Sequence, residues 1–472
     1  MSGAPPTYIG FAEYVAHVPR GIPAAVQRAA SQLLSKRATR VAETPEWEQL
    51  RQIASDMRLH TLEHLDIYLE RLEAQATAAG VKVHWARDAA EARVVVLDIA
   101  RRHHVTSAVK SKSMATEEIG LNQALEDAGI EAIETDLGEY IVQLDGTGPS
   151  HIIVPAVHLT KEAIADLFRR RLNRDVPADP ALLSALARDV LREKFLRAGM
   201  GISGANFLVA ETGTLVMVTN EGNGRMCTSL PNVHVVVAGI DKVIPDWESL
   251  AVFLKLLAPS ATGQKLTAYT SFITGPRRDG EEIGPKEVHL VLLDNGRSKV
   301  LRDPVGREAL KCIRCGACLN VCPVYKNVGG FAYGWFISGP IGAILLPQLL
   351  GTRVARELPY ASTLCGACAE ACPVKVPFPT ILRHLRHRVA EGDAHGEPGL
   401  PTAMRIVAGA VSIALTWSPI YEFGGRVLSC LSRVLSRGAW LWTAPYPLSR
   451  WTKVRPLPSF DSRFRHWWRM RG

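Results

Sequence analysis

The spacing of apolar positions divides the chain into a helical beginning and a mixed part. Residues 24–40 are rich in alanine, leucine, arginine and glutamine, and residues 47–72 carry apolar side chains at helical spacing, so we predict a helical N-terminal segment over residues 1–75. From about residue 80, short apolar strands alternate with amphipathic helices. This alternation predicts an α/β domain over residues 76–295, with a parallel or mixed sheet that helices cover on both faces.

The expected elements of this domain follow a regular order in its first half. Strands are predicted at 81–85, 108–110, 130–134 and 151–155, and helices at 89–102, 115–128 and 161–172. The second half carries strand-like segments at 207–210, 215–218, 233–238 and 287–293. Few helices are expected between these later segments, so we predict a more antiparallel arrangement there.

Cysteine is distributed very unevenly along the chain. Seven of the nine cysteines lie between positions 312 and 372. The N-terminal residues show no basic segment followed by an apolar one, so we expect no signal peptide and a cytoplasmic location. Thiols stay reduced in that compartment, and clustered cysteines there are more often metal ligands than disulfides.

The first cysteine motif has the spacing of a bacterial ferredoxin. Cys312, Cys315, Cys318 and Cys322 form a C-x2-C-x2-C-x3-C run that Pro323 follows. In such runs the first three thiolates bind one cubane cluster and the fourth binds the other. A zinc site usually closes with two C-x2-C pairs, so this spacing favours iron–sulfur clusters over zinc.

The second motif has only three cysteines of the same run, because Ser362 stands where the first would be. The ferredoxin rule assigns Cys312, Cys315, Cys318 and Cys372 to the first cluster, and Cys322, Cys365 and Cys368 to the second. The second cluster then lacks one thiolate. Four possibilities stay open for the fourth position. The ligand is a serine oxygen such as that of Ser362, another residue or a partner, or the fourth iron is absent and the centre is 3Fe–4S. Cys227 and Cys430 lie outside the module and are expected to be plain thiols.

The two motifs define a two-cluster module over residues 296–385, within which residues 327–352 carry no charge. One membrane span would separate its ends by about 30 Å. Cys318 and Cys372 are expected to share one cluster, so we predict a buried insert or a one-sided membrane contact rather than a transmembrane helix.

The remaining residues, 386–472, are predicted to form a C-terminal domain with a helical apolar stretch at 406–417. Its last part, 431–472, holds eight arginines and Lys453 against Asp461, which is nine cations against one acid, and five tryptophans. Arginine with tryptophan suits a membrane interface or an acidic partner. Docking onto the rest of the chain is the alternative. Nucleic acid is not expected, because no nucleic-acid-binding motif accompanies the charge.

Several longer segments resemble one bacterial family. They are Lys110–Asn122, Glu134–Gln143, Pro149–His158, Gly204–Gly213, Asn220–Arg225 and Pro231–His234. Together with the cysteine motifs, they resemble the iron–sulfur B proteins of lactate-utilisation systems, whose N-terminal part is a lactate-utilisation (LUD) domain. The resemblance implies a fold similar to the CoA-transferase and sugar-phosphate-isomerase superfamily and two 4Fe–4S clusters. It also implies two partners, a cysteine-rich-domain subunit and a small LUD-domain subunit.

The same segments supply a candidate anion or carboxylate pocket in the LUD domain. Lys110 and its neighbours follow a predicted strand, where α/β sheets bind ligands. The candidate residues are Lys110, Lys112, Ser113, Glu211, Gly213 and Glu221. The alternative is that they are turn, cap and packing residues. The histidines are expected to be structural: His103, His104, His151, His158 and His234.

The resemblance implies an electron-transfer subunit of a complex that oxidises L-lactate to pyruvate, with quinone or another acceptor. The same role for another 2-hydroxyacid, such as glycolate, and a redox-sensing scaffold are the alternatives. We find no flavin or nicotinamide fingerprint, because the glycine-rich segments lack the G-x-G-x-x-G spacing after a strand. The first two-electron step is therefore expected on a partner, and catalytic residues stay unknown. The chain is expected in the cytoplasm, with peripheral contact to the inner face of the membrane as an open alternative.

Overall fold

The computed structural model describes two compact units, Met1–Pro398 and Gly399–Gly472. The described residues are 10–16, 18, 21–147, 151–334, 336–392, 399–436, 438, 440–444, 449–452, 456–459, 468 and 470.

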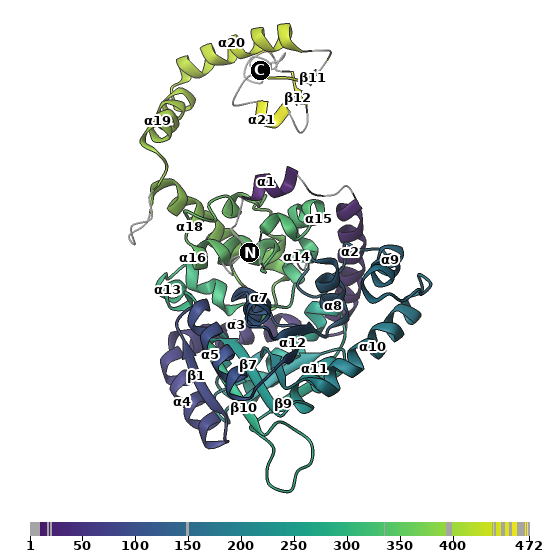
Figure 1. Cartoon of the computed structure of the whole chain (residues 1–472). Coiled ribbons are helices and arrows are strands. Elements are labelled where there is room, and N and C mark those ends of the chain that lie inside the picture. The colour runs from purple at the N-terminus through teal and green to yellow at the C-terminus, as the bar shows by residue number, and fades with distance from the viewer. Residues whose placement is uncertain are drawn as a thin grey trace. The chain divides into compact units, whose positions relative to one another are not determined.

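A six-stranded parallel sheet forms the centre of the first unit (Figure 1). Its strand order is β1 (Lys82–Ala86), β10 (Glu287–Leu293), β7 (Val233–Gly239), β4 (Met200–Ser203), β2 (Ser107–Lys110) and β3 (Glu131–Glu134). Every neighbouring pair is parallel. The carboxyl ends of all six strands therefore meet at one edge of the sheet, where α/β proteins commonly bind ligands.

Helices cover both faces of this sheet, as predicted. Ala108 on β2 packs in the cluster formed with α5 (Ala89–Arg102) and α7 (Leu121–Asp127). Its neighbour Val109 packs in the opposite cluster, formed with α8 (Leu137–Asp145), α9 (Lys161–Leu172) and α10 (Pro180–Arg197). Farther along the sheet, α4 (Leu65–Ala78) packs against β7 and β10. Successive strand residues point to opposite faces, so strands buried on both sides read as continuous apolar runs.

A smaller sheet accounts for the antiparallel part of the prediction. Its order is β8 (Val243–Ile244), β5 (Phe207–Val209), β6 (Thr214–Thr219) and β9 (Tyr269–Ile273). The strand β6 runs antiparallel to both β5 and β9, as expected. For β7 and β10 the antiparallel prediction is wrong. They join the parallel sheet, and the chain between them includes the long helix α12 (Trp247–Thr262), which the sequence reading did not place.

Two local predictions in the first half are also corrected. Residues 151–155 form bends and a turn, because His151 Nδ1 accepts the backbone N–H groups of Ile153 and Val154, which a strand would need for its ladder. The helix predicted at 115–128 is two helices, α6 (Met114–Glu118) and α7. Gly120 separates them with φ +62°, which lies outside the helical region.

The N-terminal segment is helical, as predicted, and consists of α1 (Phe11–Ala16), α2 (Gly21–Ala42), α3 (Trp47–Glu63) and α4. Arg58 on α3 is 2% exposed and donates hydrogen bonds to four backbone carbonyls. Two of them, Asp241 and Val243, belong to the α/β part, and the other two, Leu310 and Lys311, directly precede the first cysteine motif. Arg58 thus connects three segments of the first unit, whose domain boundaries at 75 and 295 stay a prediction.

The cysteine motifs lie among short helices. These are α13 (Arg297–Arg302), η2 (Gly306–Lys311), α14 (Ala317–Val321), α15 (Pro323–Val328), η3 (Phe331–Tyr333), α16 (Gly339–Leu350), η4 (Leu358–Tyr360), α17 (Ala367–Ala371) and α18 (Phe378–Glu391). Within the uncharged stretch, α16 is buried from Gly339 to Gln348. The stretch is therefore a buried insert at this helix, the first of the two predicted alternatives. The helix α18 crosses the predicted boundary at 385/386.

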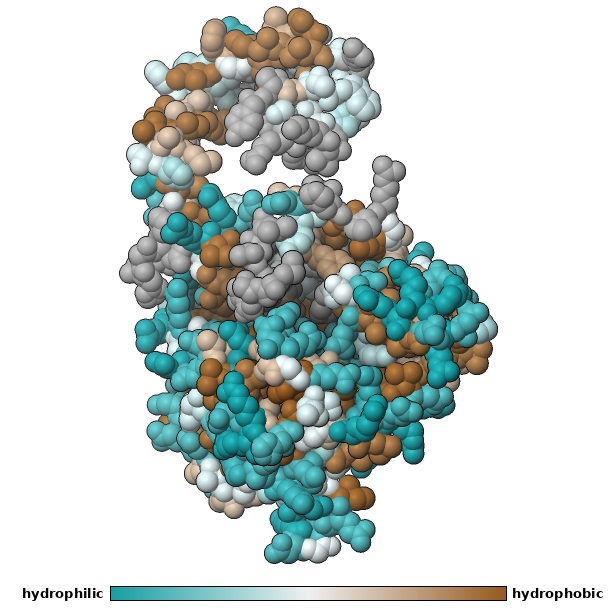
Figure 2. Space-filling model, viewed as in Figure 1, coloured by the Kyte–Doolittle hydropathy of each residue, from teal (hydrophilic) through white to brown (hydrophobic). Residues whose placement is uncertain are grey.

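The second unit contains two apolar helices, α19 (Thr402–Thr416) and α20 (Ser418–Leu435). The apolar residues Ile406, Ile413 and Phe423 are each at least 60% exposed, and Figure 2 shows hydrophobic surface along both helices. Among the described residues, no single helix has the length and composition to cross a membrane. The segments Thr402–Thr416 and Ser418–Ser432 meet that test only as a pair bent by 97°.

Short elements follow in this unit: β11 (Trp440–Leu441), α21 (Ser449–Thr452) and β12 (Leu457–Pro458). Of the basic tail, Lys453, Asp461 and Trp467 lie outside the described residues.

Candidate metal centre and adjoining cavity

The two cysteine motifs adopt the same backbone conformation. Gly316 and Gly366, each directly after a cysteine, have φ +75° and +85°. The residues directly before those cysteines, Arg314 and Leu364, have φ +61° and +55°, which is uncommon for residues with a side chain. The short helices that follow, α14 and α17, pack against each other. The missing first cysteine has therefore not changed the local fold of the second motif.

The structure brings Cys312, Cys315, Cys318 and Cys372 together in the interior. Burial raises the pKa of the Cys318 thiol well above its usual range, and the sulfurs of the other three, together with that of Cys368, also raise it. Burial likewise raises the pKa of Cys372 to about 11, with Cys312 contributing. Three buried cysteines and the half-buried Cys312, whose sulfurs interact so closely, are a donor set for a multinuclear metal cluster, which stabilises thiolates.

The other three cysteines lie around a separate cavity, which Ser362 also lines. Burial, with a contribution from the Cys322 sulfur, raises the pKa of Cys368 to about 12. Cys365 is exposed, and the backbone N–H of Ala367 lowers the pKa of its thiol. Cys322, Cys365 and Cys368 thus lie around one cavity, and the assignment of the seven cysteines to two clusters stays a prediction.

The surroundings of both sets fit iron–sulfur clusters. Backbone N–H groups point at the sulfurs, from Arg314 to Cys312 at 3.4 Å in the first set and from Tyr325 to Cys322 at 3.5 Å in the second. Such N–H···S contacts are typical of protein-bound clusters and adjust their reduction potentials. Of the two remaining cysteines, Cys227 is buried in α11 (Asn223–Ser229), where its sulfur lies 3.3 Å from Thr135 Oγ1, and Cys430 is exposed on α20.

A cavity of about 360 Å³ adjoins the first motif at the carboxyl edge of the parallel sheet. Residues that follow β2, β4 and β7 line it, including Lys112, Ser113, Gly204 and Lys242. A Cβ at Gly204 would lie 2.6 Å from Ser113 Oγ, so only glycine fits there without a shift. Arg314 closes the cavity from the cysteine module.

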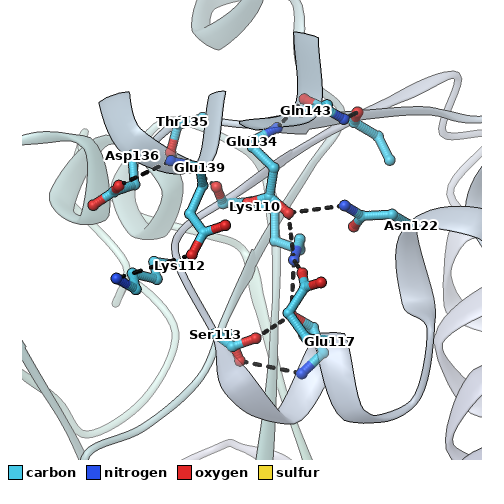
Figure 3. A network of polar contacts seen from close by, with 12 residues as sticks. Lys110, Lys112, Ser113, Glu117, Asn122, Glu134, Thr135, Asp136, Glu139 and Gln143 are labelled. Atoms are coloured by element: carbon cyan, nitrogen blue, oxygen red, sulfur yellow. Dashed lines mark hydrogen bonds and ion pairs between the residues drawn. The ribbon is translucent and has the colours of Figure 1, made fainter. Parts of the chain in front are cut away.

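Three of the six predicted pocket residues line this cavity: Lys112, Ser113 and Glu221. Lys112 Nζ lies 3.9 Å from Glu139 Oε1, and burial raises the pKa of that carboxyl group to about 8 (Figure 3). Burial and the nearby Asp136 raise the pKa of Glu221 as well. Ser113 caps α6 by accepting the backbone N–H of Thr116.

Lys110 does not line the cavity. Its side chain is 1% exposed, and Nζ lies 2.6 Å from Glu134 Oε1, 2.7 Å from Glu117 Oε1 and 2.9 Å from Thr116 Oγ1 (Figure 3). Burial opposes its charge, but the two glutamates raise the pKa of Lys110 above its usual value. Lys110 is therefore a permanently charged, structural member of a closed network.

Glu211 and Gly213 also lie away from the cavity, in the turn between β5 and β6. Glu211 Oε2 accepts the backbone N–H of Trp247 at 3.3 Å. Gly213 has φ +68°, and a Cβ there would lie 2.3 Å from the backbone nitrogen of Ala76. Both positions have the turn and packing roles that were the alternative interpretation.

The sequence analysis missed three cations at the cavity: Lys242, Arg297 and Arg314. Arg297 binds Glu118 at 2.8 Å and Asp241 at 2.5 Å. Burial opposes the charge of Asp241, but Arg297 outweighs this effect and holds the pKa of Asp241 well below its usual range. Lys242 and Asp241 directly follow the apolar run of β7. The rule that ligands lie after parallel strands would have found them, had β7 been assigned to the parallel sheet.

The histidines have structural contacts. His151 Nδ1 accepts two backbone N–H groups, so its Nε2 carries the proton and donates to Asn320 Oδ1, 3.2 Å away in α14. This bond fastens the 151–155 loop to the first cysteine motif. His234 is fully buried, and its Nε2 pairs with Ser203 Oγ at 2.8 Å. His103 Nε2 lies 3.3 Å from Glu287, which Lys82 also binds at 2.6 Å.

Comparison with known proteins agrees with this geometry. Residues 69–293 match the model of the LUD domain, and residues 308–376 match that of the 4Fe-4S dicluster domain. A solved structure of a DUF162 family protein from Deinococcus radiodurans covers 48% of this chain and 98% of its own, at 12% identity and a TM-score of 0.28. That score is too low to add to the assignment.

The fold and the cysteine sets therefore define an iron–sulfur protein with a LUD domain. Lactate utilization protein B from Shouchella clausii is 44% identical over 95% of this chain and 93% of its own length. The proteins of the same name from Bacillus licheniformis and Bacillus subtilis are 43% and 42% identical, each over 94% of this chain and 92% of their own. The chain belongs to the lactate utilization protein B family.

Proposed function

We propose that this protein is the electron-transfer subunit of a complex that oxidises L-lactate to pyruvate. The observation that carries the proposal is a difference in exposure between the two predicted cysteine sets: Cys315, Cys318 and Cys372 of the first are buried, whereas Cys365 of the second is exposed. When bound, two iron–sulfur clusters accept and release electrons one at a time. In this proposal the first set, beside the cavity, is the entrance for electrons, and the second set, which reaches solvent at Cys365, is the exit.

The protein's partners supply the remaining chemistry in this proposal. A cysteine-rich-domain subunit and a small LUD-domain subunit provide the first two-electron step, and quinone or another carrier accepts the electrons. The printed names of the relatives support a lactate-utilisation system. The second unit supports a peripheral contact with the inner face of the membrane, because α19 and α20 expose apolar side chains and the tail of the chain is basic.

We further propose that both centres are 4Fe–4S clusters and that Ser362 Oγ is the fourth ligand of the second. Ser362 Oγ accepts the backbone N–H of Leu364 at 3.1 Å, just as Cys312 Sγ accepts that of Arg314 at 3.4 Å. This equivalent hydrogen bond, and the place of Ser362 beside the cavity that Cys322, Cys365 and Cys368 line, support the serine oxygen as the replacement for the missing sulfur.

The test is anaerobic purification followed by iron and sulfide assays and low-temperature electron paramagnetic resonance. About eight irons per chain and two interacting signals in the dithionite-reduced protein are expected. Addition of L-lactate together with the two partner subunits should produce the same reduced signals, whereas glycolate should not. If glycolate reduces the clusters and L-lactate does not, the substrate of the complex is glycolate. Clusters that stay oxidised during turnover would refute the electron-transfer role.

A further inference from the structure

The cavity between the sheet and the first cysteine motif has the features of a built ligand site. It lies at the carboxyl edge of the parallel sheet, and its volume of about 360 Å³ is in the range of sites for organic ligands. Apolar side chains form much of its wall, among them Ile152, Leu257 and Phe336. Such a wall suits a ligand with an apolar body, and polar groups at a few positions then determine how it binds.

Two cations at this cavity have unused hydrogen-bonding capacity. Arg314 has a side chain that is only 10% exposed, and its Nη1 is buried and has no hydrogen-bond partner among the described residues. Its Nη2 lies 3.8 Å from Asp241 Oδ2, too far for a hydrogen bond. Lys242, half-buried beside Asp241, forms no ion pair or hydrogen bond with the residues that the structure describes. A buried donor without a partner is costly, and an anionic ligand would satisfy both groups.

The third cation in this part of the cavity does not compete for the ligand. Arg297 is held by Glu118 through both carboxylate oxygens, at 2.8 Å each, and by Asp241. It is therefore occupied by the two nearest acids, Glu118 and Asp241, and the three cations Arg297, Lys242 and Arg314 still outnumber these two acids by one. The lining acids Asp136 and Glu221 belong to another group, with Lys112, at the segment that begins α8. Lys242 and Arg314 thus remain as the pair of cations open to a ligand.

Arg314 also belongs to the first cysteine motif. It lies between Cys312 and Cys315 in the chain, and its backbone N–H contacts Cys312 Sγ. The equivalent residue of the second motif, Leu364, has the same backbone conformation but cannot bind an anion. The left-handed conformation is therefore a property of the motif, whereas the arginine is particular to the motif that borders the cavity.

We propose that this cavity binds an organic carboxylate, with Lys242 and Arg314 holding the carboxylate group and the apolar wall holding the rest of the ligand. Arginine and lysine are suited to this role, since charge-assisted hydrogen bonds to carboxylates are strong. Binding there places the ligand against the loop that surrounds the buried cysteine set. The proposal does not depend on which compound donates electrons to the complex.

The test is calorimetric titration of the anaerobic, cluster-loaded full-length protein with L-lactate, pyruvate and inorganic phosphate. At least one of the two carboxylates is expected to bind, and Lys242→Met should weaken its binding by about ten- to a hundred-fold. The control is Lys255→Met, which makes the same change at an exposed position of α12, the helix that also supplies Leu257 to the cavity wall. It should leave the affinity unchanged.

Paramagnetic resonance of the reduced protein gives a second readout. The bound carboxylate should alter one of the two cluster signals in the wild type and leave both unaltered in Lys242→Met. Arg314→Lys, which keeps the charge, should retain part of the affinity. Failure of both carboxylates to bind, binding of phosphate alone, or equal affinity in Lys242→Met would each overturn the proposal. None of these results would affect the lactate-dependent reduction test of the proposed function.

Discussion

The two cysteine motifs share a backbone conformation but differ in their surroundings. Cys315 and Cys318 of the first motif are each 7% exposed and pack in the main hydrophobic core, whereas Cys365 of the second motif is exposed. A buried cluster is shielded from solvent and oxidants, and an exposed one can exchange electrons with a partner. The difference means that a partner can reach the second motif at Cys365 more readily than it can reach Cys315 or Cys318 of the first.

The largest expected effect distinguishes the two motifs by removal of a ligand. Cys318→Ala should lose the first cluster and also soluble protein, because the residue is part of the core. Cys365→Ala should lose only the second cluster, about half of the bound iron, and keep a folded chain. Iron analysis with circular dichroism checks both. Equal loss of folding in the two variants would contradict the comparison.

The second expected effect concerns the two arginines that hold the motifs. Arg58 is buried and binds the carbonyls of Leu310 and Lys311 before the first motif. Arg386 binds the carbonyls of Pro359 and Ser362 before the second, at 2.9 Å and 3.0 Å. Arg58→Met leaves four buried carbonyls without a partner and should reduce the free energy of unfolding by about 3 kcal/mol. Arg386→Met is the matched variant.

For Arg386→Met we expect a loss of about 1 kcal/mol or less, because its partners are partly exposed. Its effect should instead be selective, with faster loss of the second cluster in air. Chemical denaturation and iron release measure the two quantities. A larger loss of stability in Arg386→Met than in Arg58→Met would mean that burial does not distinguish the motifs.

A third prediction concerns the only ligand position that differs between the motifs. If Ser362 Oγ binds the second cluster, Ser362→Ala should convert it to a three-iron centre, visible as a new signal in the oxidised protein. Ser362→Cys should give a four-iron cluster that is more resistant to oxidation. Iron content and paramagnetic resonance read both outcomes. An unchanged second cluster in Ser362→Ala would show that the ligand comes from elsewhere.

The sequence could predict the chemistry of the cysteine motifs because ligand spacing is local. It could also predict the parallel sheet from the strand–helix rhythm. It could not predict that Lys110 closes a buried network while Lys112, two residues on, lines the cavity, because that depends on the partners Glu117 and Glu134. The position of Arg314 at the cavity likewise depends on how the cysteine module packs against the sheet, which no local pattern encodes.

The smallest effect compares the thiols themselves, in protein stripped of iron. A backbone N–H lowers the pKa of Cys365, while burial raises that of Cys318 well above its usual range. Since the thiolate is the reactive form, an alkylating reagent should modify Cys365 first near neutral pH. Its rate should rise with pH and level off below the pH at which an ordinary thiol does so, whereas Cys318 should react only on unfolding. Peptide mass spectrometry over time measures both rates.

Cys368, whose pKa is raised to about 12, is the internal control and should react more slowly than Cys365 three residues away. Modification of Cys318 as fast as Cys365 would mean that the buried set opens to solvent without iron, and that the clusters rather than the fold create the difference between the motifs.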